Sequence, residues 1–412
     1  MLDIAAGGDA FNPDIVDPET GEVIADRRDS LAFKLSQISR SNKNERRRTI
    51  RGYRSKVQRM VRETLKATST PKGNRWRVCD CMRLPVPLKE SVIVAQSPTT
   101  KTAALRNLVT CGQVWTCPVC ASKIASVRRD EVRQGLERHL AGGLVAVSVT
   151  LTVRHGVGHS AKRLLVAMAG ALKRMRANRR VRQLREGYHY RGQIRALEVT
   201  YGHANGWHPH FHEVWFFDTK LWSESSTASM QEEIAQAWLA AVETGGLPKP
   251  SKEIGVVVKR IEEARDYEGK GNASIDGIND WDAADELTRS IAKTAKPGRM
   301  SPFDLLVAGE FDLFREYAGA FHGKRQLTWS PGLKSHFAIG EVTDEEAAGE
   351  DESEGVPVLA IDHREWMRAF KVMPEIGTRL LDQVEREGAV AAVAWLRSLG
   401  YAARVVEPPG PV

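Results

Sequence analysis

The sequence predicts an α+β protein: a ferredoxin-like antiparallel sheet with helices on one face, preceded by a cysteine-rich zinc-binding segment and followed by a helical C-terminal region. Strand-like and helix-like patterns succeed one another between residues 144 and 259 in the order strand, helix, strand, strand, helix, strand. Two closely spaced cysteine pairs lie upstream, and helical periodicity dominates residues 362–399. With 412 residues, 42% of them hydrophobic, the chain can form one or two packed domains.

The N-terminal part of the chain changes character near residue 40. Residues 1–39 are expected to be loosely ordered, because the stretch 1–30 is polar and rich in glycine, proline and aspartate. Residues 40–78 form a basic segment in which fourteen lysines and arginines face two glutamates, with a weak helical stripe of apolar residues. Its run Arg46-Arg47-Arg48 favours contact with phosphate groups, although a solvated basic helix that binds nothing would show the same pattern.

Residues 79–143 carry all five cysteines: Cys79, Cys81, Cys111, Cys117 and Cys120. A C-x₂-C knuckle that follows an earlier cysteine pair is typical of a structural zinc site, so we expect four of the five thiolates to bind Zn²⁺. The spacing does not identify the spare cysteine, and reduced thiols packed in a core are the alternative. A helix over residues 121–140, closed by two glycines, is predicted to end this segment.

The sheet is predicted from six segments that follow this helix. The first helix places leucines and methionines on one face, and its other face includes Lys173, Arg174, Arg176, Arg179 and Arg180. The two middle strands are joined by a stretch rich in glycine and asparagine, which favours a hairpin. The segments are a strand at 144–153, a helix at 160–185, strands at 194–201 and 207–217, a helix at 226–243 and a strand at 255–259.

Histidines are concentrated at the start of the second hairpin strand. Side chains two apart on a strand share a face, so His210 and His212 can converge on one divalent cation. If the hairpin is centred near residue 204, Glu198 lies opposite His210 and supplies a third ligand; a register slip of one residue would turn it away. His208 shares the face of His210 and is a competing ligand. Mg²⁺ or Mn²⁺ suits such a site, and neutral histidines beside a sheet are the alternative.

Several of these motifs resemble those of a known family. His210-Phe211-His212 resembles the histidine–hydrophobic–histidine motif of the HUH endonucleases, and residues 205–212 resemble the rolling-circle replication initiators of small bacterial plasmids. The cysteine stretch 111–120 and the strand motif Thr150-Leu151-Thr152 resemble the same initiators, which are built on a ferredoxin-like sheet. The resemblance extends over residues 75–334 and implies that residues 144–335 form a nicking domain with a basic tail.

The resemblance also implies a nucleophile. Tyr267 and Lys270 look like the tyrosine–x–x–lysine motif of HUH enzymes, in which the tyrosine attacks a DNA phosphate, keeps the 5′-phosphate as an ester and frees a 3′-hydroxyl primer. Glu263, with Glu262 beside it, is the candidate for activating the water that ends the reaction. A surface tyrosine without a catalytic role is the alternative, and Tyr317 is the rival nucleophile.

The rest of the chain suggests contacts with DNA. Lys324, Arg325 and Trp329 form a basic, aromatic stretch suited to strand contact and base stacking, although Trp329 fits a core position equally well. Residues 336–357 are predicted to be an acidic linker, and residues 358–407 to form C-terminal helices.

The net charge of +8 favours a polyanionic partner. We expect a cytoplasmic protein without a membrane partner, because we find neither a secretory signal nor an apolar run long enough to cross a bilayer. The predicted function is a plasmid rolling-circle initiator that binds and nicks the origin and works with host replication proteins. The alternatives are an HUH relaxase or single-strand transposase, and a zinc-stabilised DNA-binding protein without catalysis.

Overall fold

The computed structural model describes residues 14–16, 23–26, 37–38, 42–262, 299–349 and 355–406, and it has a mixed α+β architecture with antiparallel sheets. A two-stranded hairpin, β1 (Asp14–Val16) and β2 (Val23–Asp26), is the only regular structure described before residue 42. Most of the segment predicted to be loosely ordered lies outside the described residues. None of the described helices is both long enough and apolar enough to span a bilayer.

The largest sheet has five strands in the order β8-β5-β7-β6-β9, and every neighbouring pair is antiparallel. Apolar residues alternate along β5, and aromatic residues are frequent in β7. Both faces of these central strands are buried over much of their length. The strands are β5 (Val145–Thr152), β6 (Tyr190–Gly202), β7 (Gly206–Phe217), β8 (Val256–Ile261) and β9 (Leu327–Trp329).

The predicted succession of strands and helices is confirmed between β5 and β8. The helix expected over 160–185 is two helices, α4 (Ala161–Ala177) and α5 (Arg179–Gly187). Asn178 separates them because its extended ψ of 134° ends α4, while its side chain caps the first amides of α5. A capping box at Ser223 starts α6 (Glu224–Thr244), and the short α7 (Lys252–Gly255) leads into β8.

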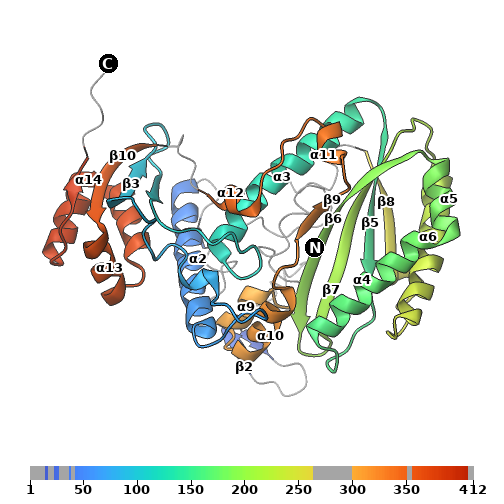
Figure 1. Cartoon of the computed structure of the whole chain (residues 1–412), viewed down its shortest axis with the longest axis horizontal. Helices are drawn as coiled ribbons and strands as arrows, with labels where there is room; N and C mark the ends of the chain where they lie inside the picture. Colours follow the sequence, from blue (N-terminus) through green and yellow to red (C-terminus); the bar gives the residue numbers. More distant parts are fainter. Residues whose placement is uncertain are drawn as a thin grey trace, which may run out of the picture.

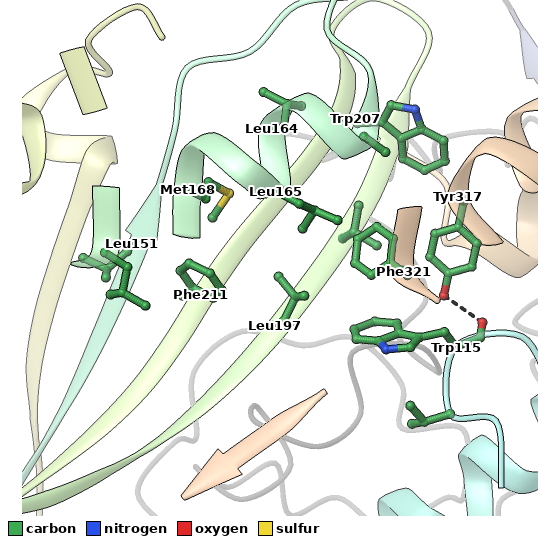
Figure 2. Close-up of a cluster of buried hydrophobic side chains, with 14 of the residues drawn as sticks. Trp115, Leu151, Leu164, Leu165, Met168, Leu197, Trp207, Phe211, Tyr317 and Phe321 are labelled. Atoms are coloured by element: carbon green, nitrogen blue, oxygen red, sulfur yellow. Dashed lines mark hydrogen bonds between the residues drawn. The ribbon is translucent and has the colours of Figure 1, made fainter. Parts of the chain in front are cut away.

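Helices α4 and α6 cover one face of this sheet, as Figure 1 shows. Leu164, Leu165 and Met168 of α4 lie in one buried cluster with strand residues such as Leu197 and Phe211 (Figure 2). The prediction of helices on one face only was incomplete. The second face is partly covered by α3 (Pro118–Ala141) and α11 (Leu333–His336), whose apolar residues form a separate cluster with strands β5 to β8.

A smaller four-stranded sheet, in the order β11-β10-β3-β4, lies at the other end of the molecule (Figure 1). Its strands are β3 (Ser91–Gln96), β4 (Ala103–Arg106), β10 (Val356–Asp362) and β11 (Arg404–Val405). Helices α13 (His363–Val372) and α14 (Ile376–Ser398) complete a separate apolar core around Trp366. The C-terminal region is therefore not purely helical, because β10 pairs with a strand of the cysteine-rich segment more than 250 residues earlier.

Helix α2 (Lys43–Leu65) connects the two parts of the structure. Arg51 forms ion pairs with Asp382 and Glu385 of α14, and the apolar stripe of α2 packs in the main core. The remaining helices are η2 (Arg77–Cys79), α9 (Pro302–Val307), α10 (Phe311–Phe321) and α12 (Asp344–Ala348). Helix α12 lies within the predicted acidic linker and is held by an ion pair between Arg128 and Asp344.

Candidate functional site

The β6–β7 hairpin brings an acid and two histidines together. Glu198 is paired with His210 across the hairpin, which is the register expected from a turn centred near residue 204. Gly206, with φ of 71°, opens β7 in the left-handed region that glycine tolerates. A Cβ at this position would lie 3.0 Å from the backbone of Gly156 and Val157, so a larger residue would push away the loop after β5.

The geometry of this trio suits a divalent cation. One carboxylate oxygen, Oε2 of Glu198, lies 2.7 Å from Nε2 of His210 and 2.8 Å from Nε2 of His212. The carboxylate is buried, with 2% of Glu198 exposed, so it needs a positive partner to offset its lost hydration. Two imidazoles and a carboxylate with further positions open form a donor set for Mg²⁺, Mn²⁺ or a related ion.

A hydroxyl on the neighbouring strand orients one of these imidazoles. Thr150 of β5 is paired with His212, and its Oγ1 lies 3.2 Å from Nδ1 of that ring. The contact leaves Nε2 of His212 facing Glu198, as expected where a second partner fixes the orientation of a metal-binding histidine. The sequence placed Thr150 in a family motif but did not indicate this contact.

His208 belongs to a different arrangement. Its Nδ1 makes a short contact with Nε2 of His155, and Nδ1 of His155 lies 2.7 Å from the carbonyl oxygen of Asn205. Burial, and next the neighbouring His210, lower the pKa of His208 to about 2, so this ring is neutral. Among the described residues, the group that can hold a cation at this end of the sheet contains Glu198, His210 and His212 and leaves His208 out. Sequence analysis missed His155, which no motif marks.

Four of the five cysteines form a second candidate metal group, made of Cys81, Cys111, Cys117 and Cys120. The sulfur of Cys120 lies 3.5 Å from that of Cys81 and 3.7 Å from that of Cys111. Zn–S bonds of about 2.3 Å in a tetrahedron would separate the sulfurs by about 3.8 Å, so the spacing fits one ion. Burial raises the pKa of the Cys117 thiol, and a cation would reverse this effect.

Cys79 is the cysteine outside this group. It is buried at the end of η2, but the group of four sulfurs does not include it. A polar contact to the group comes from α2, where Nε2 of Gln58 donates to the sulfur of Cys117 at 3.3 Å. Arg62 in turn donates to Oε1 of Gln58. Part of the basic segment is therefore used to support the cysteine group.

The predicted nucleophile and its neighbours lie outside the described residues, since Tyr267, Lys270 and Glu263 all fall in 263–298. The rival Tyr317 has no exposed surface, and its hydroxyl donates to the carbonyl oxygen of Trp115 at 2.8 Å (Figure 2). Burial raises its pKa well above the ordinary value, and its ring stacks on Trp207. This tyrosine is a core residue without access to a substrate.

The residues predicted to contact DNA differ in their exposure to solvent. Arg47 is exposed and Arg48 half-buried, whereas Arg46 is only 7% exposed and donates to the carbonyl oxygen of Ile38. Lys324 and Arg325 are exposed before β9.

Trp329 is half-buried on edge strand β9 and packs against α3, where a Cβ at Gly135 would lie 3.1 Å from its ring. Phe337 also contacts this ring, and the ammonium of Lys334 lies over it. The core interpretation of Trp329 therefore has direct structural support.

Comparison with known proteins connects these features to one family. A family model described as "Replication protein" matches residues 102–371, well over half of the chain. A "Protein rep" from Streptomyces lividans is 30% identical, and the match covers 60% of this chain and 68% of that protein. The chain therefore belongs to this family of plasmid replication initiators, whose members bind DNA at the plasmid origin.

A second relative matches a smaller part of the chain. A "Neomycin resistance protein" from Streptomyces cyanogenus is 31% identical, and the match covers 30% of this chain and 33% of that protein. The matched region thus spans a third of the length of that relative. No solved structure matches the chain significantly.

Proposed function

We propose that this replication initiator nicks and rejoins one strand of its plasmid origin by HUH-type chemistry, with Tyr267 as the nucleophile, and thereby starts rolling-circle replication. The observation that carries the proposal is the trio at one end of the main sheet, in which a buried Glu198 faces the partly buried His210 and His212. Its strand order also supports the proposal: β8, β5, β7 and β6 are the fourth, first, third and second strands of a β-α-β-β-α-β unit, as in a ferredoxin-like sheet.

Chain length allows Tyr267 to reach this trio. The last residue of β8, Ile261, pairs with Ala146, whereas His212 pairs with Thr150 on the same strand β5. Four residues along β5 and two strand spacings across the sheet separate the two points by about 16 Å. The six residue steps from Ile261 to Tyr267 can span up to about 20 Å. Tyr317, in contrast, is buried in the core, which favours Tyr267 between the two candidates.

The chemistry assigns a role to each residue. Glu198, His210 and His212 would hold a Mg²⁺ or Mn²⁺ ion, which supplies Lewis-acid polarisation of a phosphate oxygen. The phenolate oxygen of Tyr267 forms a bond to phosphorus while the bond to the 3′-oxygen breaks, and that oxygen takes a proton to become the primer hydroxyl.

Further residues act before and after this step. Lys270 favours the phenolate by its charge, because a phenol of pKa near 10 is otherwise a weak nucleophile at neutral pH. Glu263, or its neighbour Glu262, activates the water that releases the last ester. We also propose that the cysteine group binds Zn²⁺ and supports the fold without taking part in the reaction.

The decisive experiment is adduct mapping. The full-length protein, with Mn²⁺ and a labelled single strand from its origin, should form a covalent complex that survives denaturing electrophoresis, and peptide mass analysis should place the DNA on Tyr267. Tyr267→Phe should abolish the adduct, and the matched change Tyr188→Phe in the aromatic cluster beside Trp222 should leave it intact. An adduct that persists in Tyr267→Phe would remove the central claim.

The same assay separates the alternatives. A zinc-stabilised DNA-binding protein without catalysis would bind the origin strand tightly and leave it uncut with Mn²⁺ present. An HUH relaxase or single-strand transposase would form the same adduct, but its cleaved sequence would belong to a transfer origin or a transposon end. We favour the replication initiator because the family match covers most of the chain.

A further inference from the structure

The helix pair α4–α5 carries a concentration of positive charge that the proposed chemistry does not use. Residues 173–187 contain seven lysines and arginines and one glutamate, so this short stretch supplies six of the eight net charges of the chain. Like charges one helical turn apart destabilise a helix when they are unpaired. Stability of the fold alone therefore does not explain why this stretch carries so many of them.

Four of the seven basic residues have partners within the protein. Arg174 donates to the carbonyl oxygen of Ala241 at the end of α6, and Arg176 pairs with Glu213 at 2.6 Å. The other two are Arg180, which lies 3.7 Å from Glu233, and Arg185, which stacks over Tyr190 and Trp215. These contacts fix α4 and α5 against the sheet and α6.

The other three, Lys173, Arg179 and Arg182, are exposed, and among the described residues no acidic side chain forms an ion pair with them. Arg179 and Arg182 are three apart on α5 and share one helix face. These three residues define the α4–α5 basic face. Helices α4 and α5, which carry this face, lie on the right of Figure 1.

This face is on the opposite side of the main sheet from the trio of Glu198, His210 and His212. Phe211 of β7 points toward α4, as the cluster in Figure 2 shows. Its neighbours His210 and His212 therefore point away from α4, because successive side chains of a strand alternate between faces. A nucleic acid on the α4–α5 basic face would leave the trio open to a second segment of DNA.

The composition of the face distinguishes between forms of DNA. Sites for single strands combine basic residues with aromatic rings on which bases stack. Helices α4 and α5 contain no aromatic residue between positions 161 and 187, and the ring of Tyr188, which follows α5, packs against Phe217 and Trp222. Basic side chains without stacking partners suit the regular, closely spaced phosphates of a duplex.

We propose that the α4–α5 basic face binds the phosphate backbone of double-stranded DNA, so that the initiator holds a duplex part of the origin while the other side of its sheet takes the single strand. This inference deepens the proposed function, because the assignment of the second side to a single strand rests on it. The duplex contact itself depends only on the exposed charges and their geometry.

The test uses the full-length protein and two probes, a short labelled duplex and a labelled single strand of the same sequence. The triple variant Lys173→Gln, Arg179→Gln, Arg182→Gln should lower duplex affinity at 0.1 M salt by about tenfold to about five-hundredfold, and should reduce the slope of log affinity against log salt by about 2.7. Its affinity for the single strand and its Mn²⁺-dependent adduct should stay within about twofold of wild type.

Two control variants guard against trivial effects. Lys371→Gln, Arg386→Gln, Arg404→Gln removes three exposed charges from the smaller sheet and its helices, and should leave duplex binding unchanged. Lys173→Arg, Arg179→Lys, Arg182→Lys keeps the charge and should retain duplex affinity. Equal loss in the first control, or wild-type duplex affinity in the triple glutamine variant, would overturn the inference. Duplex binding without any adduct in the wild type would instead refute the proposed function alone.

Discussion

Replacing the neighbouring cysteines Cys79 and Cys81 one at a time tests the assignment of the cysteine group. Both side chains are buried, with 4% and 0% exposed, and they are two residues apart, so a change to alanine removes the same atoms from similar surroundings. Of these two cysteines, only Cys81 contributes a sulfur to the group of four. The pair therefore isolates the metal contribution from the packing contribution.

The expected magnitudes differ several-fold. Losing a buried sulfur from a packed core costs about 1 kcal/mol, by comparison with a buried methylene, and this applies to both variants. Structural zinc sites contribute about 10–16 kcal/mol of binding free energy, so one ligand of four accounts for about 3–4 kcal/mol. Cys79→Ala should therefore lower the free energy of unfolding by about 1 kcal/mol and Cys81→Ala by about 4–5 kcal/mol.

Metal content and denaturant unfolding should be measured together. Wild type and Cys79→Ala should each hold one zinc per chain by elemental mass spectrometry, and a strong chelator should destabilise both. Cys81→Ala should bind zinc about two-hundredfold to about a thousandfold more weakly, because it has lost about 3–4 kcal/mol of binding free energy, and it should release the ion to a weaker chelator than wild type does. If Cys79→Ala bound zinc as weakly as Cys81→Ala, or if wild type contained no bound zinc, the grouping of the four sulfurs would be refuted.

Three further outcomes are expected. Glu198→Gln should weaken Mn²⁺ binding, measured by calorimetry, by more than about a hundredfold. His208→Ala should change it by less than the roughly tenfold that loss of an outer-shell partner costs, because His208 contacts His155 and lies outside the trio. Tyr317→Phe should lower the free energy of unfolding by about 1–3 kcal/mol, since the carbonyl of Trp115 loses its donor, without affecting the adduct. Burial raises the pKa of Glu385, but hydrogen bonds from Arg51 and the backbone outweigh this and leave it lowered. The ionised carboxylate therefore stabilises the fold above its unfolded-state pKa, and this effect is lost on acidification. As the pH falls from about 5 to about 3, the free energy of unfolding should decrease more in wild type than in Glu385→Gln.

Local patterns were sufficient to predict the hairpin that carries the trio. The alternation of β7 placed His210 and His212 on one face, and the turn composition around residue 204 set the register that brings Glu198 opposite His210. Both features depend on residues close together in the chain. Short-range geometry of this kind leaves few alternatives once the turn is located.

Contacts between distant segments could not be predicted in the same way. The pairing of β3 with β10 joins residues more than 250 positions apart, and neither strand carries a local signal for its partner. His155 reaches His208 from the loop after β5, and the position of Cys79 outside the sulfur group depends on the path of η2. The spacing of the cysteines in the sequence predicts thiolate ligands, but it does not show whether Cys79 or Cys81 points toward the other sulfurs.

Helix α3 connects the cysteine group to the sheet. At its start, Cys117 caps the helix with its sulfur and Cys120 lies in the first turn. Toward its other end, Val132 and Leu136 share an apolar cluster with Phe216 of β7, and the ring of His139 lies edge-on to that of Phe216. A helix of 24 residues spans about 36 Å. Phe216, His210 and His212 are an even number of positions apart on β7, so their side chains project from the same face of the sheet. This is the face that α3 covers at Phe216. We therefore expect loss of the proposed Zn²⁺ at the cysteines to loosen the support of the histidine strand, because one helix connects both candidate metal groups.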